Sequence, residues 1–475
     1  MIFPTVQFAL FFAVVLPLSW ALMPRQRLWR PGILVASYAF YVASGWQYAF
    51  LLAGSTVLNQ AAATVISRSG SAKVRRAALV GAIATDLAAL AVFKYLDFFT
   101  ETINATVGVS LSLLHLALPV GISFFTFQAI SYVVDVHRGR APLARNLDYA
   151  LYAAFFPHLV AGPIVRATEF IPQLSGPRDA DKVPAARALS LIAGGLIKKV
   201  VFAEFIGEKL VDPVFGAPQA HSSLEALTAV YGYAVQIYCD FSAYTDMAIG
   251  LALLIGFQFP DNFNRPYSAV SLQDFWRRWH MTLSRWLRDY LYIALGGSRG
   301  GKLKTYRNLL LTMLLGGLWH GAAWTFVIWG AIHGVGLGVE RLWRDNRMPE
   351  RCAPYTSRVP GTVRRAAARV VTFHVVCLAW VFFRAPDLGS AFAVLSRVTA
   401  SPGGSGTGLV TPTVVLLIAS VLLLQGLPRG LGPRLRTVLA GLPAPALGVA
   451  LGGLVLVVAA IGGGRGVAPF IYFRF

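Results

Sequence analysis

The chain contains 475 residues, of which 56% are hydrophobic and only 13% are charged. Apolar runs close to the roughly 20 residues that cross a bilayer recur along its whole length, which excludes an ordinary soluble protein and indicates a polytopic membrane protein. Lys and Arg number 42 against 21 Asp and Glu, but the basic residues cluster in short loops between apolar runs. This is the positive-inside pattern of membrane proteins, and it explains the charge without nucleic acid.

Membrane helices and basic loops alternate through the first part of the chain. Residues 3–23 are long enough to span a bilayer and precede the basic loop RQRLWR, so we expect a first helix that is retained. Residues 147–173 contain prolines at 157, 163 and 172, which predict a broken or re-entrant element because proline interrupts helices. The other elements expected here are spans at 32–52, 77–95 and 110–134 and a short or re-entrant segment at 53–66.

The second part continues as apolar helices around one conspicuous hydrophilic stretch. Residues 308–339 can form one kinked helix or two helices. The hydrophilic stretch at about 341–365 predicts a soluble loop. No internal repeat and no shift in composition divides the chain. We therefore expect a single all-α integral-membrane domain over residues 1–475, with about 10–13 membrane segments. The remaining expected helices lie at 187–205, 224–259, 368–383, 410–427 and 438–461.

An acidic residue, Asp240, lies within one of these apolar runs, in the sequence YCDFSAYTDMAIG. A carboxylate in a membrane interior is expensive, so it should face a polar cavity or a cationic side chain. Pairing with an arginine and a direct role in substrate binding both fit this position.

Residues 271–291, SLQDFWRRWHMTLSRWLRDYL, have the pattern of one amphipathic helix that lies in the membrane interface. Ser271 can cap its start, with Asp274 near the positive end of the helix dipole. The apolar stripe should meet acyl chains, and its members are Leu272, Phe275, Trp276, Trp279, Leu283, Trp286, Leu287 and Tyr290.

The arginines of this segment fit two kinds of ligand. They can contact lipid head groups, or they can attract an anionic acyl donor such as coenzyme A or a phosphopantetheinyl carrier. The candidate donor ligands are Arg277, Arg278 and Arg285.

Two histidines carry the chemistry that the sequence suggests. His280 lies at the rim of the apolar stripe, and His320 lies in the uncharged run LLGGLWHGAAW beside Trp319 and Gly321. A neutral imidazole in such surroundings can take a proton from a hydroxyl, and the small residues after it leave room for a substrate. A hydrogen bond from His320 to a neighbouring helix is the alternative.

Other kinds of site find little support. Cys239, Cys352 and Cys377 form no paired motif and show no metal spacing, and we assign them no role. No three histidines have the spacing of a metal site, and no GxSxG motif indicates a serine hydrolase.

The sequence resembles the membrane-bound O-acyltransferases, and within them a bacterial branch that modifies exopolysaccharides. The resemblance rests on segments in the family's order across most of the chain: PVGISFFTFQAISYVVDVHRG, FFPHLVAGPIVR, YCDFSAYTDMAIGLALLIGFQFPDNFNRPY, DFWRRWHMTLSRWLRDYLYIALGG, LLGGLWHGAAWTFVIWGAIHG, WVFFRA and PFIYFRF. His158 and Cys239 depart from the usual residues at their positions.

This resemblance implies a function and a setting. It implies that His320 is the catalytic residue, that His280 is its companion, and that helices surround a central tunnel opening to the cytoplasm. It also implies a multi-pass protein of the bacterial inner membrane, with acetyl-CoA or an acyl-carrier thioester as donor and no bound cofactor. The acceptor would be a polysaccharide, and an extracytoplasmic acetyltransferase partner would complete the transfer.

Two alternatives to exopolysaccharide acetylation stay open. One is transfer of D-alanine or another acyl group from a carrier protein. The other is a polysaccharide or lipid transporter whose buried polar groups line a path without acyl chemistry.

Overall fold

The computed structural model describes residues 3, 5–160, 162–176, 178–346, 361–400, 406–427 and 453. These residues form helices, turns and irregular segments and contain no strand, in agreement with the predicted all-α class. They divide into two compact units. Unit 1 is built from the described residues up to 197 and from 243–261, and unit 2 from 198–242 and 262–427. The assignment of residues 1–475 to one domain stays a prediction.

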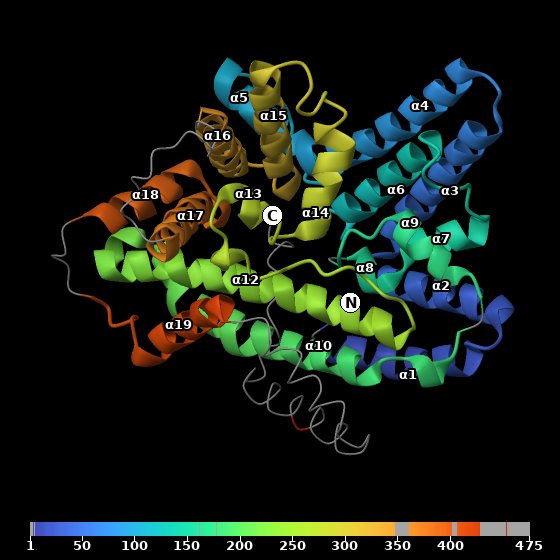
Figure 1. Cartoon of the computed structure of the whole chain (residues 1–475), viewed down its shortest axis with the longest axis horizontal. Coiled ribbons are helices and arrows are strands. Elements are labelled where there is room, and N and C mark those ends of the chain that lie inside the picture. The colour runs from blue at the N-terminus through green and yellow to red at the C-terminus, as the bar shows by residue number, and fades with distance from the viewer. Residues whose placement is uncertain are drawn as a thin grey trace. The chain divides into compact units, whose positions relative to one another are not determined.

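Unit 1 has a core of helices that pack directly on one another. Figure 1 shows α3, α4 and α6 side by side, and buried side chains from several elements, such as Tyr41, Leu52 and Phe125, fill the space between them. The helices of unit 1 are α1 (Val6–Leu22), α2 (Gln26–Val42), α3 (Trp46–Arg68), α4 (Ala72–Leu90), α5 (Leu96–Val107), α6 (Ile122–His137), α7 (Asn146–Ala154), α8 (Phe156–Leu159), α9 (Ala167–Phe170) and α10 (Ala185–Ile197), with a π-helical turn at Ala91–Tyr95 and 3-10 turns at Ile171–Leu174 and Ala180–Lys182.

Helix boundaries in unit 1 differ from the prediction at several places. The predicted span 110–134 is helical only from Ile122, α5 was not expected, and one further difference lies at a glycine. Gly45 has a φ of 137°, a conformation that residues with a Cβ rarely adopt. The turn that contains Gly45 separates α2 from α3. The predicted span 32–52 is therefore divided between these two helices, and the predicted re-entrant segment 53–66 is part of α3. The broken element at 147–173 is confirmed, because α7, α8 and α9 replace a continuous helix there.

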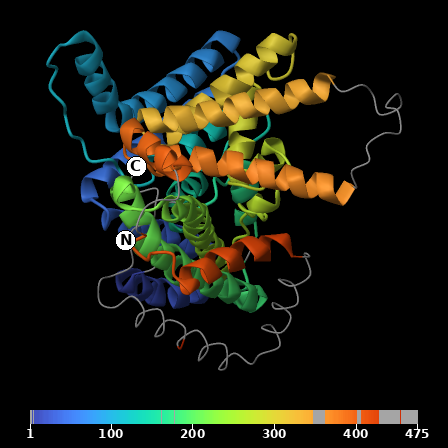
Figure 2. The same cartoon turned by 90° about the vertical axis from the view of Figure 1, so that its left-hand side faces the viewer.

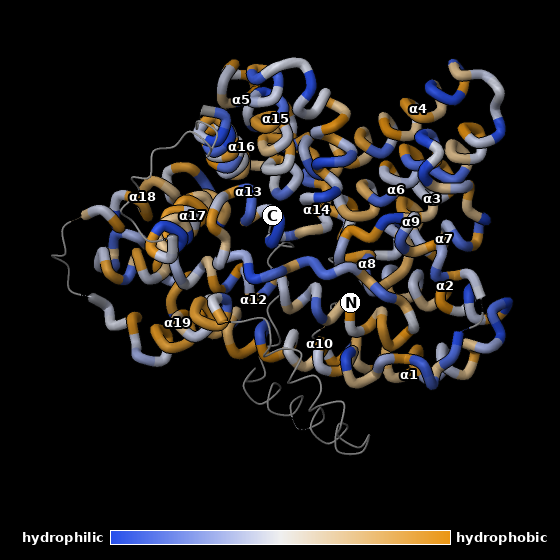
Figure 3. Tube along the Cα trace, viewed as in Figure 1, coloured by the Kyte–Doolittle hydropathy of each residue, from blue (hydrophilic) through white to orange (hydrophobic). Residues whose placement is uncertain are grey.

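Unit 2 contains the second group of long helices. Figure 2 shows α16 and α17 running side by side, and α18 and α19 are predominantly hydrophobic in Figure 3. Its helices are α11 (Asp212–Gly216), α12 (Ser223–Leu254, which continues into unit 1), α13 (Leu272–Trp276), α14 (Met281–Trp286), α15 (Lys302–His320), α16 (Trp324–Asn346), α17 (Gly361–Arg384), α18 (Leu388–Thr399) and α19 (Pro412–Gly426), with π-helical segments at Lys198–Glu204, Gly207–Val211 and Leu287–Tyr292 and a 3-10 turn at Pro218–Ala220 and another at Pro266–Ser268.

Three predictions for the last third of the chain have different outcomes. The run at 308–339 forms two helices, α15 and α16. Both ends of the predicted soluble loop at 341–365 are helical, in α16 and α17, while 347–360 lie outside the described residues. The expected span at 438–461 also lies outside them, apart from Gly453.

Helix α18 was not expected, although its start carries a recognisable cap. The Asp387 carboxylate accepts hydrogen bonds from the backbone N–H and the hydroxyl of Ser390. These bonds favour the ionised form, so they lower the pKa of the Asp387 carboxyl. Asp is one of the residues preferred at the N-cap of a helix, because its carboxylate accepts the first backbone N–H groups.

Three helical stretches among the described residues are long and apolar enough to cross a membrane, namely Trp46–Arg68, Ala72–Val107 and Gly361–Arg384. Together with the other apolar helices, they agree with an all-α polytopic membrane protein. The predicted total of 10–13 segments stays a prediction.

Glycines bring α15 and α16 into close contact. A Cβ at Gly317 would lie 2.3 Å from the Phe326 carbonyl oxygen, and one at Gly330 would lie 2.4 Å from the Met313 carbonyl oxygen. Only glycine allows the two backbones to approach so closely, as at many helix contacts in membrane proteins. This contact positions the end of α15, where His320 lies.

Candidate active site

The segment that carries His280 is broken where the sequence predicts one amphipathic helix. It consists of α13, a turn at residues 277–280, α14 and a π-helical segment. Ser271 caps α13 as expected, since its hydroxyl accepts the Asp274 N–H at 3.0 Å. The prediction of a continuous helix over 271–291 is therefore wrong at the turn before α14.

Residues distant in sequence explain this break. The Asn262 backbone carbonyl accepts the Met281 N–H at 2.9 Å, and its side-chain Oδ1 accepts the Thr282 N–H at 3.1 Å. These are the first donors of α14, which an uninterrupted helix would satisfy internally. At the start of α13, the Glu340 carboxylate from α16 accepts the N–H groups of Leu272 and Gln273. Each short helix thus has its own cap from elsewhere in unit 2.

The apolar stripe of this segment faces the protein interior. All eight of its predicted members are buried, and Trp279 is completely so. The expectation that the stripe meets acyl chains is not met in unit 2, because neighbouring aromatic side chains from α12, α16 and α17 cover it.

His280 is fully buried and has a left-handed backbone, with φ at 40° and ψ at 55°. A residue other than glycine in this region is uncommon and strained by about 1–2 kcal/mol. Its ring lies edge-on to Phe241, with centroids 4.7 Å apart, and 6.2 Å from the Trp319 ring. The sequence pattern predicts His280 at the rim of an apolar stripe that faces the membrane. The turn instead directs its side chain into the core of unit 2.

His320 is the last residue of α15 and is also buried, with 3% of its surface exposed. Its ring contacts Trp319 at 5.0 Å, Trp329 at 5.0 Å and Phe383 at 5.3 Å between centroids. Because both histidine rings contact Trp319, the structure brings the two predicted site residues into one aromatic cluster.

The small size of Gly321 has a structural consequence. A Cβ at this position would lie 2.0 Å from the Phe326 ring. The absence of a side chain therefore makes room for Phe326, and a role of Gly321 in substrate binding stays a prediction.

His333, which the sequence analysis did not single out, belongs to the same cluster. It is fully buried on α16, and its ring lies 4.9 Å from Trp329. The Trp276 Nε1–H donates to its Nδ1 at 3.3 Å. Its spacing of thirteen residues from His320 did not predict that the two residues share a cluster. Helical periodicity applies only within one helix, and the turn at 321–323 separates the helices that carry them.

A cavity of about 440 Å³ lies next to this cluster within unit 2. Its wall residue Trp276 contacts Trp329 and His333 of the cluster, while none of the three histidines is among the residues that line the cavity. Five arginines and one glutamate are the charged residues that line it: Arg277, Arg285, Arg288, Arg341, Arg344 and Glu340.

Only some of the arginines that were predicted to bind the acyl donor line the cavity. Arg277 and Arg285 line the cavity, whereas Arg278 does not and instead forms an ion pair of 2.8 Å with Asp274. Arg341 and Arg344 were missed because they come from α16, within the stretch that the sequence predicts as a soluble loop.

Asp240 has a cationic partner, as expected, and this partner is a lysine. Its Oδ1 lies 2.7 Å from the Nζ of Lys199, and Lys199 also lies 3.7 Å from Glu204. Both members of the close pair are almost fully buried. This contact supplies the cationic partner that a buried carboxylate requires, and a direct role of Asp240 in binding a substrate stays a prediction.

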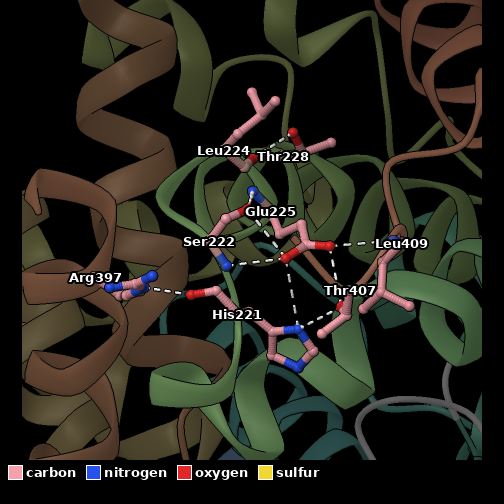
Figure 4. A network of polar contacts seen from close by, with 8 residues as sticks. All are labelled: His221, Ser222, Leu224, Glu225, Thr228, Arg397, Thr407 and Leu409. Carbon is pink, nitrogen blue, oxygen red and sulfur yellow. Dashed lines mark hydrogen bonds and ion pairs between the residues drawn. The ribbon is translucent and has the colours of Figure 1, made fainter. Parts of the chain in front are cut away.

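A second polar cluster contains Ser, His and Glu side chains but lacks the arrangement of a hydrolytic triad (Figure 4). The Ser222 hydroxyl donates to Glu225 at 3.0 Å and not to His221. Glu225 also accepts the Ser222 N–H, while the Glu225 N–H donates to Ser222, which together form the capping box of α12. A nucleophile must contact its base, so this cluster serves to start the helix.

Comparison with known proteins supplies the family. The sequence model of the membrane-bound O-acyltransferase family matches residues 143–378. The chain is 44% identical to the probable alginate O-acetylase of Pseudomonas aeruginosa over 372 residues, which cover 76% of this chain and 68% of that protein. It is 39% identical to the peptidoglycan O-acetyltransferase of Helicobacter pylori over 406 residues, covering 80% and 75%.

A more distant relative has another acyl group in its name. The teichoic acid D-alanyltransferase of Bacillus subtilis is 29% identical over 285 residues, which cover 56% of this chain and 68% of that protein. The residues that match the family model include α12, the broken segment with His280 and helices α15 and α16. The chain therefore belongs to the membrane-bound O-acyltransferase family and is an O-acyltransferase.

Proposed function

We propose that this protein passes an acetyl group from a cytoplasmic thioester toward hydroxyl groups of a polysaccharide outside the bacterial inner membrane. The observation that carries the proposal is the contact of two buried histidines with Trp319, in an aromatic cluster that reaches an arginine-lined cavity of unit 2 through Trp276. The names of the more similar relatives, an alginate O-acetylase and a peptidoglycan O-acetyltransferase, support acetyl as the group and a polysaccharide as the acceptor.

The cavity is suited to the activated donor. Coenzyme A and phosphopantetheinyl carriers both carry phosphates, and guanidinium groups bind phosphate through paired, charge-assisted hydrogen bonds. The walls also contain apolar side chains, including Trp276, Leu287 and Met313, which can contact the pantetheine arm. We propose Arg277 and Arg285, with Arg341 and Arg344, as the residues that hold the donor, and no bound cofactor is required.

The proposed chemistry assigns the general base to His320. Its imidazole takes the proton of the attacking hydroxyl while the oxygen forms a bond to the thioester carbonyl carbon. The carbon–sulfur bond then breaks, and the imidazolium returns the proton to the departing thiolate. His280 and Trp319 complete the surroundings of this base. Delivery to the final sugar would use an extracytoplasmic acetyltransferase partner.

The test replaces His320 by Ala and measures acetyl esters on the surface polysaccharide of cells that carry each variant. Loss of a positioned general base should lower acetylation by about 10²–10⁴-fold. His374→Ala is the matched control, because His374 is an exposed histidine on α17 whose ring contacts Tyr231 and Phe373. It should acetylate like the wild type.

Normal acetylation by a stably expressed His320→Ala protein would contradict the proposal. Mass spectrometry of the acyl group released from the polymer by mild base separates acetyl from D-alanyl transfer. A transporter without acyl chemistry predicts a different result, in which His320→Ala reduces export of the polymer as much as its modification.

A further inference from the structure

The side chain of Asn262 determines the hydrogen-bonding state of His280, and its own orientation is fixed by a backbone group. The Thr282 N–H, which can only donate, lies 3.1 Å from one end of the Asn262 amide. That end must be the oxygen, because an amide nitrogen would place two donors against each other. The Thr282 hydroxyl also donates to this oxygen, at 2.9 Å.

The same oxygen decides which nitrogen of His280 carries the proton. Asn262 Oδ1 lies 3.2 Å from the Nδ1 of His280. Since an amide oxygen is only an acceptor, Nδ1 must bear the hydrogen, and in the neutral ring Nε2 then has the lone pair. Nε2 is buried and has no hydrogen-bond partner among the described residues.

Other contacts hold this arrangement in place. The Asn262 carbonyl binds the Met281 N–H, the Asn264 N–H donates to the Arg278 carbonyl at 2.9 Å, and the left-handed backbone of His280 turns its ring toward Asn262. Asn262 is 1% exposed, and its Nδ2 has no acceptor in the described part of the chain. Leaving a buried N–H unpaired is unfavourable, so the three bonds to the oxygen must outweigh it. Strained backbone with such support is common at functional sites.

We propose that Asn262 is a positioning residue that holds His280 in the Nδ1–H tautomer, so that Nε2 is the ring's hydrogen-bond acceptor toward the reacting groups. The role in catalysis rests on the proposed acyl transfer, but the tautomer does not. His333 provides a contrast within the same cluster, because its Nδ1 accepts the Trp276 N–H and its ring should therefore be the Nε2–H tautomer.

The experiment reads the tautomer directly, by NMR of the full-length protein with ¹³C,¹⁵N-labelled histidine in lipid nanodiscs. The carbon shifts of a neutral imidazole differ between its two tautomers. The His280 signal is assigned by its loss in His280→Gln. We expect the Nδ1–H form in the wild type and in Asn262→Asp, which keeps the acceptor oxygen. Asn262→Leu should lose this preference.

Thr282→Val is the matched control, because it removes another hydrogen bond to the same oxygen without touching His280. It should keep the Nδ1–H tautomer. In acetyl-transfer assays, Asn262→Leu should lower kcat by about tenfold, the rate equivalent of one lost hydrogen bond to the reacting groups, with little change in KM. Asn262→Asp should restore much of kcat.

An Nε2–H tautomer in the wild type would overturn the proposal, even if Asn262→Leu fails to fold. An unchanged tautomer or kcat in a folded Asn262→Leu protein would also overturn it. The NMR measurement requires no turnover, so it decides the tautomer separately from whether the protein transfers acetyl groups.

Discussion

The ion pair between Lys199 and Asp240 is a contact between two side chains that are 3% and 4% exposed. Replacing Lys199 by Met leaves the carboxylate buried without its close partner, which typically destabilises a protein by about 3–5 kcal/mol. We expect the free energy of unfolding of Lys199→Met, measured by denaturation in mixed micelles, to fall by this amount.

Lys182→Met is the control for that change. Lys182 also pairs with an aspartate, Asp179, at 3.3 Å, but its side chain is 83% exposed. Solvent screens such pairs, so the loss should stay below about 1 kcal/mol. The double variant Lys199→Met/Asp240→Asn separates the two roles of Asp240. If it is as stable as the wild type but transfers no acetyl group, the Lys199–Asp240 pair acts directly on a substrate and is not only structural.

Helices α15 and α16 depend on glycine at their contact. Gly317→Ala would place a Cβ 2.3 Å from the Phe326 carbonyl oxygen, and this backbone atom cannot rotate away. We expect a loss of about 1–3 kcal/mol in the free energy of unfolding, as for other overpacked sites. The same measurement in mixed micelles checks it.

A glycine of α16 in open surroundings provides the comparison. Among the described residues, no heavy atom outside its own turn of helix lies within 4 Å of a Cβ built at Gly338. Gly338→Ala should therefore be neutral or stabilising by up to about 1 kcal/mol, because Ala favours the helix. Equal effects of the two substitutions would mean that the backbone approach at Gly317 is unimportant for the helix pair.

The sequence predicted structural elements correctly where their cause lay in neighbouring residues. The prediction failed where the cause was a contact with residues distant in the sequence. The prolines between 147 and 173 correctly indicated a broken element. The break before His280 could not be predicted, because its cause is Asn262, eighteen residues earlier. Similarly, Arg341 and Arg344 join the cavity only through the packing of α16 against α13.

The whole chain carries a large excess of positive charge, and part of it lines the cavity in unit 2. Arg341→Gln/Arg344→Gln should raise KM for acetyl-CoA by about tenfold or more, because each charged hydrogen bond contributes about 1.5–3 kcal/mol, while kcat should change little. KM of the wild type should also rise with salt, which screens charges beyond roughly 10 Å at 0.1 M.

Arg278→Gln serves as the control, since Arg278 belongs to the same basic segment but pairs with Asp274 outside the cavity. Steady-state kinetics in nanodiscs at two salt concentrations make the comparison. A rise in KM for Arg278→Gln without one for the double variant would place the donor elsewhere.

The caps of the broken segment have a consequence for synthesis on the ribosome. Helix α13 has five residues, too few to be stable alone, and the carboxylate that caps it belongs to Glu340, 68 residues later. During translation, α13 emerges well before its cap exists. The segment around His280 can therefore take its final shape only after α16 has been made and has packed, so a nascent chain that ends at residue 320 would contain both histidines without a finished site.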